Sequence, residues 1–184
     1  FYSKNKKLRI GIARAGNVLG GGDWSLNRLI PDCVKSWSKN RSVFIRNPNS
    51  TRPWQHVLEA VYGYLILATK LKKEEKINGQ AFNFGPNTKN VKKVLEVIKL
   101  MKKNWKKVKF QITSNKNFYY ESKLLKLNSK KALKKLNWKC LLSFEETIIM
   151  VASWYRNFYS NKKKVSNYTT LQISQFEQLI KKRK

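Results

Sequence analysis

The sequence predicts an α/β or α+β fold in one compact unit that covers residues 1–184, and two observations support this prediction. Short runs in which apolar and polar residues alternate, typical of strands, are interspersed with longer runs in which apolar residues recur every three or four positions, typical of helices. No internal repeat or linker divides the chain, and its length suffices for one domain with a substantial core. Strands that alternate with helices are typical of layered α/β domains.

The first elements follow from residue period and turn residues. Residues 8–15 predict a strand, because apolar residues alternate there with polar or small ones before small residues take over. A helix is predicted to begin near Pro31, since proline suits the first helical turn. A short strand at 43–45 is followed by the turn formers of 47–50. The residues expected to turn this helix toward the core are Cys33, Val34 and Trp37.

The middle of the chain predicts two helices and two strands. Residues 55–71 have a helical period, and residues 81–84 predict a strand that Gly85-Pro86 ends. Thr88 can cap the second helix through its hydroxyl group, and alternation over 108–112 predicts another strand. The apolar face of the helix after Thr88 consists of Val91, Val94, Leu95, Ile98 and Met101.

Two cap signals organise the last third of the chain. Asn128 is predicted to cap a short helix over 129–136. Ser143 and Glu146 form a capping box, in which each side chain satisfies a backbone N–H that the helix start leaves free. The basic tail 181–184 is expected to fray in solvent.

The net charge of +30 raises nucleic acid as a partner. Of the 40 Lys and Arg residues, 29 lie beyond residue 66, and most of these are lysines spread over the whole of that part. No helix-turn-helix, zinc or RNA-recognition signature accompanies the charge. We therefore expect no nucleic-acid partner, and a basic nucleic-acid-binding module stands as the alternative from another class.

Cysteine usage and hydropathy indicate a reduced, cytoplasmic protein. Cys33 and Cys140 fit neither a metal-binding spacing nor a disulfide framework. No apolar run approaches the roughly 18–20 residues of a membrane span, so no membrane partner is expected. No metal site is predicted either.

A glycine-rich stretch at 13–24, ARAGNVLGGGDW, is the most informative part of the chain. Its glycine spacing does not match the GxGxxG loop that binds dinucleotide phosphates, and no helix with a following acidic residue comes after it. Asn17 follows the predicted strand directly. Because ligands of α/β sheets bind beyond the carboxyl ends of strands, Asn17 indicates a site.

A second cluster, TRPWQHV at 51–57, contains Arg52 and the single histidine of the chain, His56. An arginine just before a helix can present its two-pronged guanidinium to a diphosphate, and the helix N-terminus adds positive potential. A surface arginine packed on Trp54 is the alternative. For His56, a structural imidazole in the first helical turn is favoured over a catalytic base.

The pattern Tyr-x-x-x-Lys occurs three times, at Tyr2/Lys6, Tyr119/Lys123 and Tyr159/Lys163. With 8 tyrosines and so many lysines, one or two matches are expected by chance. None of the three lies on a helix that follows a central strand. We therefore expect no catalytic residue among them.

The two clusters, together with LIPDC at 29–33, RNPNSTRPWQHVLEAVYGYL at 46–65 and AFNFGP at 81–86, resemble the CDP-glucose 4,6-dehydratases of the extended short-chain dehydrogenase/reductase family. The resemblance extends over nearly the whole chain. It implies the end of a Rossmann-type parallel sheet plus the small C-terminal α/β lobe that binds substrate. In place of the glycine that the family has between Leu136 and Trp138, this chain has Asn137, the next-best residue for a left-handed helix terminus.

The resemblance also implies a lyase activity that depends on NAD. The family converts CDP-glucose to CDP-4-keto-6-deoxyglucose by internal redox and loss of water, for surface polysaccharides such as O-antigen. The dinucleotide loop and the catalytic Tyr and Lys of the family have no counterpart in the 184 residues. We therefore expect a fragment that is inactive by itself and that belongs to an enzyme able to form homo-oligomers. Another nucleotide-sugar epimerase or dehydratase is the alternative within the family.

The resemblance assigns roles to ten residues. Two would lie beside the nicotinamide of NAD, and eight would contact CDP-glucose or a related nucleotide sugar. Among the eight, Asn17 would lie beside the diphosphate and sugar, and Arg52 would bind the diphosphate. The cofactor residues are Ala15 and Gly16, and the substrate residues are Asn17, Leu29, Ile30, Phe44, Arg46, Arg52, Tyr120 and Glu121.

Overall fold

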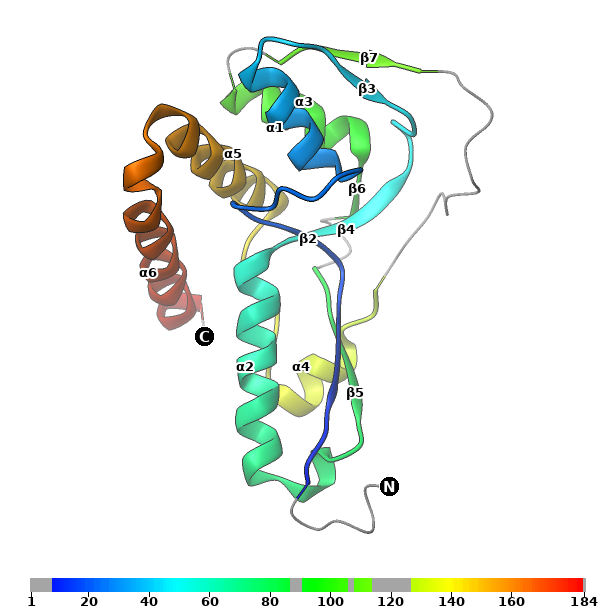
Figure 1. Ribbon diagram of the computed structural model, residues 1–184. Coiled ribbons are helices and arrows are strands. Elements are labelled where there is room, and N and C mark those ends of the chain that lie inside the picture. The colour runs from blue at the N-terminus through cyan, green and yellow to red at the C-terminus, as the bar shows by residue number, and fades with distance from the viewer. Residues whose placement is uncertain (1–7, 87–90, 106–107, 114–126, 184) are drawn as a thin grey trace.

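The computed structural model describes residues 8–86, 91–105, 108–113 and 127–183, and Figure 1 shows how their helices and strands are arranged. The described elements are, in order, β1 (Ile12–Ala15), β2 (Asn17–Leu19), α1 (Leu29–Ser38), β3 (Val43–Ile45), β4 (Thr51–His56), α2 (Val57–Lys73), a 3₁₀ turn (Glu75–Ile77), β5 (Ala81–Phe84), β6 (Val91–Lys93), α3 (Val94–Asn104), β7 (Phe110–Ile112), α4 (Lys130–Leu136), α5 (Phe144–Ser160), a second 3₁₀ turn (Lys162–Lys164) and α6 (Val165–Arg183).

Parallel pairing dominates the short strands. β1 pairs with β5, β2 with β4, and β3 with β7, all in parallel, while β6 pairs antiparallel with β4. Parallel strands need crossover connections, and α2 lies in the long connection from β1 to its partner β5. The mixed α/β class predicted from the sequence is thereby confirmed.

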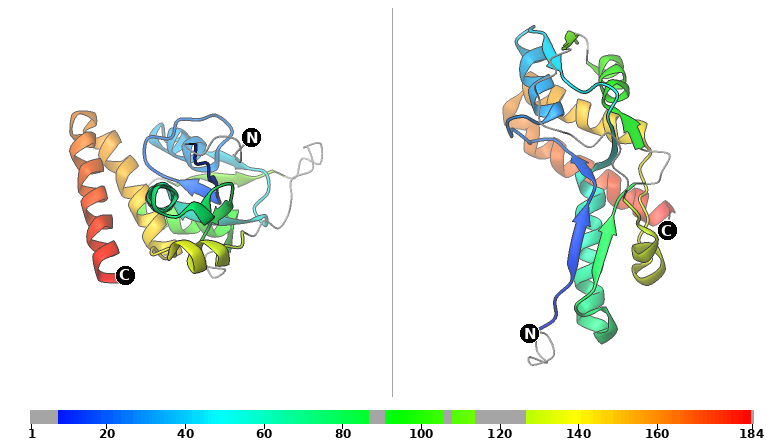
Figure 2. Two further views of the ribbon diagram at one scale, coloured as in Figure 1. Left: turned by 90° about the horizontal axis from the view of Figure 1, so that it is seen from below. Right: turned by 90° about the vertical axis from the view of Figure 1, so that its right-hand side faces the viewer.

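One part of the molecule is built on the β1–β5 pair. Helix α2 runs beside the two strands, and α4 packs on β5 (Figures 1 and 2). The buried residues of this part form one cluster, made of Leu67, Ile77, Phe82, Phe84, Ala132, Leu136 and Trp138.

The other part contains β2, β3, β4, β6 and β7 together with α1, α3 and α5, which are drawn in the upper half of Figure 1. Its larger core contains Cys33, Val34 and Trp37, the three residues predicted to face inward from α1. The indole N–H of Trp37 donates to the Lys109 carbonyl (2.8 Å) and ties α1 to the segment before β7. This part contains the cavity described below.

Two predicted helices begin later than expected, because their first residues pair as strands. Residues 51–56 form β4 between β2 and β6, so α2 begins at Val57 and not at Gln55. Val91 belongs to β6, opposite Pro53, so α3 begins at Val94. The prediction that Thr88 caps this helix lies outside the described residues. Strand pairing between distant segments outweighs helical period here.

Several local predictions hold. Asn137 has the left-handed conformation (φ 53°) that ends α4. The Asn128 side chain accepts a hydrogen bond from the Lys130 N–H (2.9 Å), although the structure places the cap at Ser129. In the capping box of α5, the Glu146 N–H donates to the Ser143 hydroxyl (3.1 Å) and the Ser143 N–H to the Glu146 carboxylate (2.7 Å).

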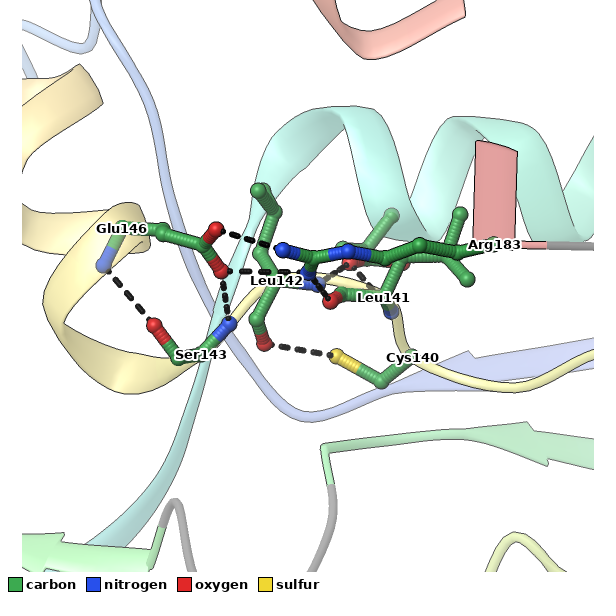
Figure 3. A network of polar contacts seen from close by, with 7 residues as sticks. Cys140, Leu141, Leu142, Ser143, Glu146 and Arg183 are labelled. Atoms are coloured by element: carbon green, nitrogen blue, oxygen red, sulfur yellow. Dashed lines mark hydrogen bonds and ion pairs between the residues drawn. The ribbon is translucent and has the colours of Figure 1, made fainter. Parts of the chain in front are cut away.

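Helix α6 was not predicted, and it corrects the expectation that the basic tail frays. Arg183 donates to the Leu141 carbonyl (2.6 Å) and forms a salt bridge with Glu146 (2.9 Å). Figure 3 shows the guanidinium of Arg183 against the same carboxylate that completes the capping box. Arg183 therefore fastens the end of α6 to the start of α5.

Candidate functional site

A cavity of about 390 Å³ opens beside β2, the start of α1, β3 and β4. Six of the eight predicted substrate residues line its wall, although they come from four separate segments of the chain. Their role in binding stays a prediction, whereas their convergence on one cavity is a structural fact. These residues are Asn17, Leu29, Ile30, Phe44, Arg46 and Arg52.

The other predicted site residues lie elsewhere. Tyr120 and Glu121 fall outside the described residues. Ala15 ends β1 and Gly16 follows it directly, but neither lines the cavity. Both precede Asn17 in the chain, and their role beside the cofactor stays a prediction.

The break between β1 and β2 directs Asn17 into the cavity. β1 pairs with β5 as far as Ala15, and from Asn17 onward the chain pairs with β4 instead. At the change of partner, a Cβ on Gly16 would lie 2.6 Å from the Pro53 carbonyl oxygen, so only glycine lets the two backbones approach this closely.

The glycines at 20–22 pack the loop after β2 onto its surroundings. A Cβ on Gly20 would overlap Val57, and one on Gly21 would overlap the ring of Trp154. The Tyr155 hydroxyl donates to the Asp23 carbonyl (2.7 Å), and Trp24 packs edge-on against the Tyr155 ring. Packing on α2 accounts for Gly20, packing on α5 for Gly21, and a positive φ of 79° for Gly22, in agreement with the rejection of a dinucleotide phosphate loop.

Arg52 does not lie just before a helix, as the sequence had suggested. It lies within β4, and α2 begins five residues later. Two helix N-termini reach the cavity: that of α1, whose first residues Leu29 and Ile30 line the wall, and that of α3, whose first residue Val94 also lines it. Arg52 is only 7% exposed, and its guanidinium donates to the Thr51 carbonyl (2.8 Å). This burial rules out the alternative of a surface arginine.

The charges in the wall favour an anion. Three arginines and two aspartates line the cavity, and the N-terminus of α1 adds its partial positive charge. A positively charged, partly buried cavity suits a phosphate or diphosphate group. The charged residues of the wall are Asp23, Arg28, Asp32, Arg46 and Arg52.

Sequence reasoning missed several residues of this wall. Arg28, Asp32 and Trp54 line the cavity, but the sequence assigned them no role. A signal was available for Arg28 and Asp32, since they flank the predicted helix start next to Leu29 and Ile30. For Trp54, alternation along β4 places its side chain on the same face as that of Arg52.

His56 has a structural environment. It is buried outside the cavity wall, and its Nδ1 accepts a hydrogen bond from the Leu58 N–H (3.3 Å) at the start of α2. Burial lowers the pKa of His56 from 6.5 to about 4, so the imidazole is neutral at pH 7. These observations support the structural interpretation of the only histidine.

Stability is expected to decrease between pH 6.5 and about 4, because the unfolded chain binds the proton of His56 more readily than the folded one. The substitution His56→Asn keeps an acceptor at the helix cap but removes the titrating group. Urea unfolding at pH 6.5 and 4.5 should therefore show a smaller loss of stability for His56→Asn than for the wild type. Equal losses would contradict the burial argument.

The remaining candidates show packing roles in the described part of the chain. Tyr159 packs edge-on against Trp105 and Phe158, and the other two Tyr-x-x-x-Lys pairs contain residues outside the described ranges. Burial raises the pKa of the Cys33 thiol, which is inaccessible in the core. Within the described ranges no group of His, Cys, Asp and Glu could hold a metal ion, and no helix is long and apolar enough to cross a membrane.

The architecture matches solved epimerases and dehydratases. UDP-glucose-4-epimerase from Stenotrophomonas maltophila superposes with a TM-score of 0.72 at 16% identity, over 86% of this chain and 51% of that one. dTDP-glucose 4,6-dehydratase from Bacillus anthracis, solved with NAD, gives 0.63 at 20% identity, over 89% and 50%. The fold is therefore the C-terminal part of the Rossmann-type epimerase and dehydratase fold.

In sequence, the chain is 36% identical over 168 residues to CDP-glucose 4,6-dehydratase of Salmonella typhimurium. The aligned residues cover 86% of this chain and 47% of the relative. No family model matches the chain. The resemblance seen in the sequence is thus confirmed: the chain is similar in sequence to a CDP-glucose 4,6-dehydratase and similar in fold to epimerases and dehydratases that act on nucleotide sugars. It spans about half the length of the relative it matches.

Proposed function

We propose that the cavity binds the nucleotide sugar CDP-glucose and that the chain is the substrate-binding part of a CDP-glucose 4,6-dehydratase. The observation that carries this proposal is the buried guanidinium of Arg52 in a cavity shared with Asn17 and the N-terminus of α1. The sequence relative, named for this activity, supports the choice of substrate. The proposed product is CDP-4-keto-6-deoxyglucose.

Each wall element has a place in this proposal. Arg52 binds the diphosphate with its two-pronged guanidinium, and the Asn17 amide lies beside the diphosphate and sugar. Leu29 and Ile30 flank the nucleotide with apolar surface, and Phe44 and Arg46 lie at the base end. The volume of about 390 Å³ is in the range of small-molecule sites, roughly 300–1,000 Å³. Tyr120 and Glu121 are assigned to the ribose and base by resemblance alone.

NAD is the proposed cofactor of the complete enzyme. Ala15 ends β1 with a methyl side chain and Gly16, which has no side chain, follows it, at the edge of a parallel sheet where ligands bind. Their small size suits a position beside the nicotinamide. Pro53 fills the space next to Gly16, so Gly16 does not form an open loop that could hold a phosphate. Bound NAD would accept a hydride from the sugar and return it, and Ala15 and Gly16 are the two residues proposed to lie beside its nicotinamide.

Isothermal titration of the purified chain with CDP-glucose tests the proposed function. We expect saturable binding to the wild-type chain, and no turnover of CDP-glucose when NAD is added to the chain alone. Absence of binding at millimolar ligand would contradict the proposed site. Turnover by the chain alone would contradict the proposal that it is catalytically incomplete. Steeply salt-dependent DNA or RNA binding that persists in Arg52→Ala would favour the nucleic-acid alternative.

A further inference from the structure

Asp32 is an acidic side chain in a cavity that otherwise favours anions. It lies in the first turn of α1, is half-buried and lines the same wall as Phe44 and Arg46. Burial raises the pKa of Asp32, while the positive charges of Lys35 and Arg46 oppose this rise. Arg46 and Asp32 are therefore within electrostatic reach of each other, and Arg46 is one of the two residues proposed above to lie at the base.

The fold gives the carboxylate of Asp23, the other aspartate of the wall, a structural role. For the carboxylate of Asp32 the contacts within the fold use only some of its hydrogen-bonding capacity. Asp23 accepts a hydrogen bond from the Ser25 N–H (2.9 Å) and shapes the loop after β2. Asp32 accepts one from the Asn27 N–H and suits the N-terminus of α1. An ionised carboxylate offers about four acceptor positions, so Asp32 retains capacity for a donor on a ligand.

The pyrimidine bases differ in what they offer such a carboxylate. Cytosine has an amino group at C4, which donates hydrogen bonds, and aspartate accepts readily from it. Uracil and thymine have a carbonyl oxygen at the same position, which would repel the carboxylate. An acceptor-only side chain at the base end therefore distinguishes cytosine from the other two bases.

We propose that Asp32 accepts a hydrogen bond from the C4 amino group of cytosine and so makes the site selective for cytidine diphosphate sugars over uridine and thymidine diphosphate sugars. This inference rests on the proposed function, because it assumes that the cavity binds a nucleotide sugar. A bidentate or charge-assisted base contact discriminates by about tenfold or more.

The test compares CDP-glucose, UDP-glucose and dTDP-glucose by calorimetry on three forms of the chain. We expect the wild type to bind CDP-glucose at least about tenfold more tightly than the other two. Asp32→Asn should lose most of this preference, because an amide can donate to a carbonyl as well as accept from an amino group. Asp23→Asn removes the same charge from the same wall and should keep the preference.

The preference is the ratio of the affinities for CDP-glucose and for the other two sugars, measured on the same variant. A substitution that weakens the binding of all three sugars equally leaves this ratio unchanged. An unchanged preference in Asp32→Asn would overturn the inference and leave the proposed function intact. Failure of the wild type to bind any of the three sugars would overturn both.

A second measurement uses only the wild type and so does not depend on the folding of a variant. The CDP analogue with hydrogen in place of the C4 amino group lacks the donor and adds no bulk. It should bind about tenfold or more weakly than CDP. Equal affinities would contradict the role of Asp32.

Discussion

Replacing Arg52 by alanine is expected to weaken CDP-glucose binding by about 100-fold or more, which corresponds to about 3 kcal/mol. Arg52 is buried in β4 and lines the cavity beside the N-terminus of α1. Its guanidinium is fixed before the ligand arrives, so little side-chain freedom is lost on binding. Removal of the cation leaves the diphosphate in a partly buried site without its main partner. Isothermal titration measures the effect directly.

Two further variants separate the guanidinium from charge in general. Arg52→Lys keeps the positive charge but not the planar pair of donors, so its affinity should fall between those of the wild type and Arg52→Ala. Arg41→Ala removes an exposed arginine that does not line the cavity, and its affinity should equal that of the wild type. Equal losses in Arg41→Ala and Arg52→Ala would indicate a diffuse effect of charge and contradict the proposed contact.

Replacing Glu59 by alanine is expected to lower the free energy of unfolding by about 4 kcal/mol, from two unsatisfied buried N–H groups and a small cavity. Glu59 lies in the first turn of α2 and is fully buried. Its Oε1 accepts from the backbone N–H groups of Leu141 (2.7 Å) and Leu142 (2.6 Å). It thereby joins α2 to the segment whose Leu141 carbonyl accepts a hydrogen bond from Arg183 (Figure 3).

Urea denaturation of Glu59→Ala measures this loss, with two variants for comparison. Glu59→Gln keeps an acceptor oxygen at the same position and should lose much less stability. Glu145→Ala removes an exposed carboxylate from the first turn of α5 and should change stability by about 1 kcal/mol or less. A loss below about 1 kcal/mol for Glu59→Ala would show that the two N–H groups find other partners.

Local sequence signals predicted the parts of the fold that depend on neighbours in the chain. The capping box of Ser143 and Glu146 and the left-handed Asn137 need only residues a few positions away. The start of α2 was predicted wrongly because residues 51–56 are held as a strand by β2 and β6. Pairing with distant segments leaves no mark in a local period, which is why β4 and β6 were missed.

The candidate site also contains residues that could be predicted from the sequence and one whose role depends on distant segments of the fold. The resemblance named six residues that the fold brings to one cavity, although no single stretch of sequence contains them all. It did not single out Asp32, because an aspartate in a first helical turn already has an ordinary explanation as a partner of the helix N-terminus. Only the shared wall with Phe44 and Arg46 gives this carboxylate a second role.

A crystal structure of the chain with CDP-glucose tests the central claim most directly, since that claim concerns where the nucleotide sugar binds. We predict density for the ligand in the cavity beside β2, α1, β3 and β4, with diphosphate oxygens within hydrogen-bond distance of the Arg52 guanidinium. Ligand bound only to the lysine-rich surface, or lying in the cavity without contact to Arg52, would contradict the account.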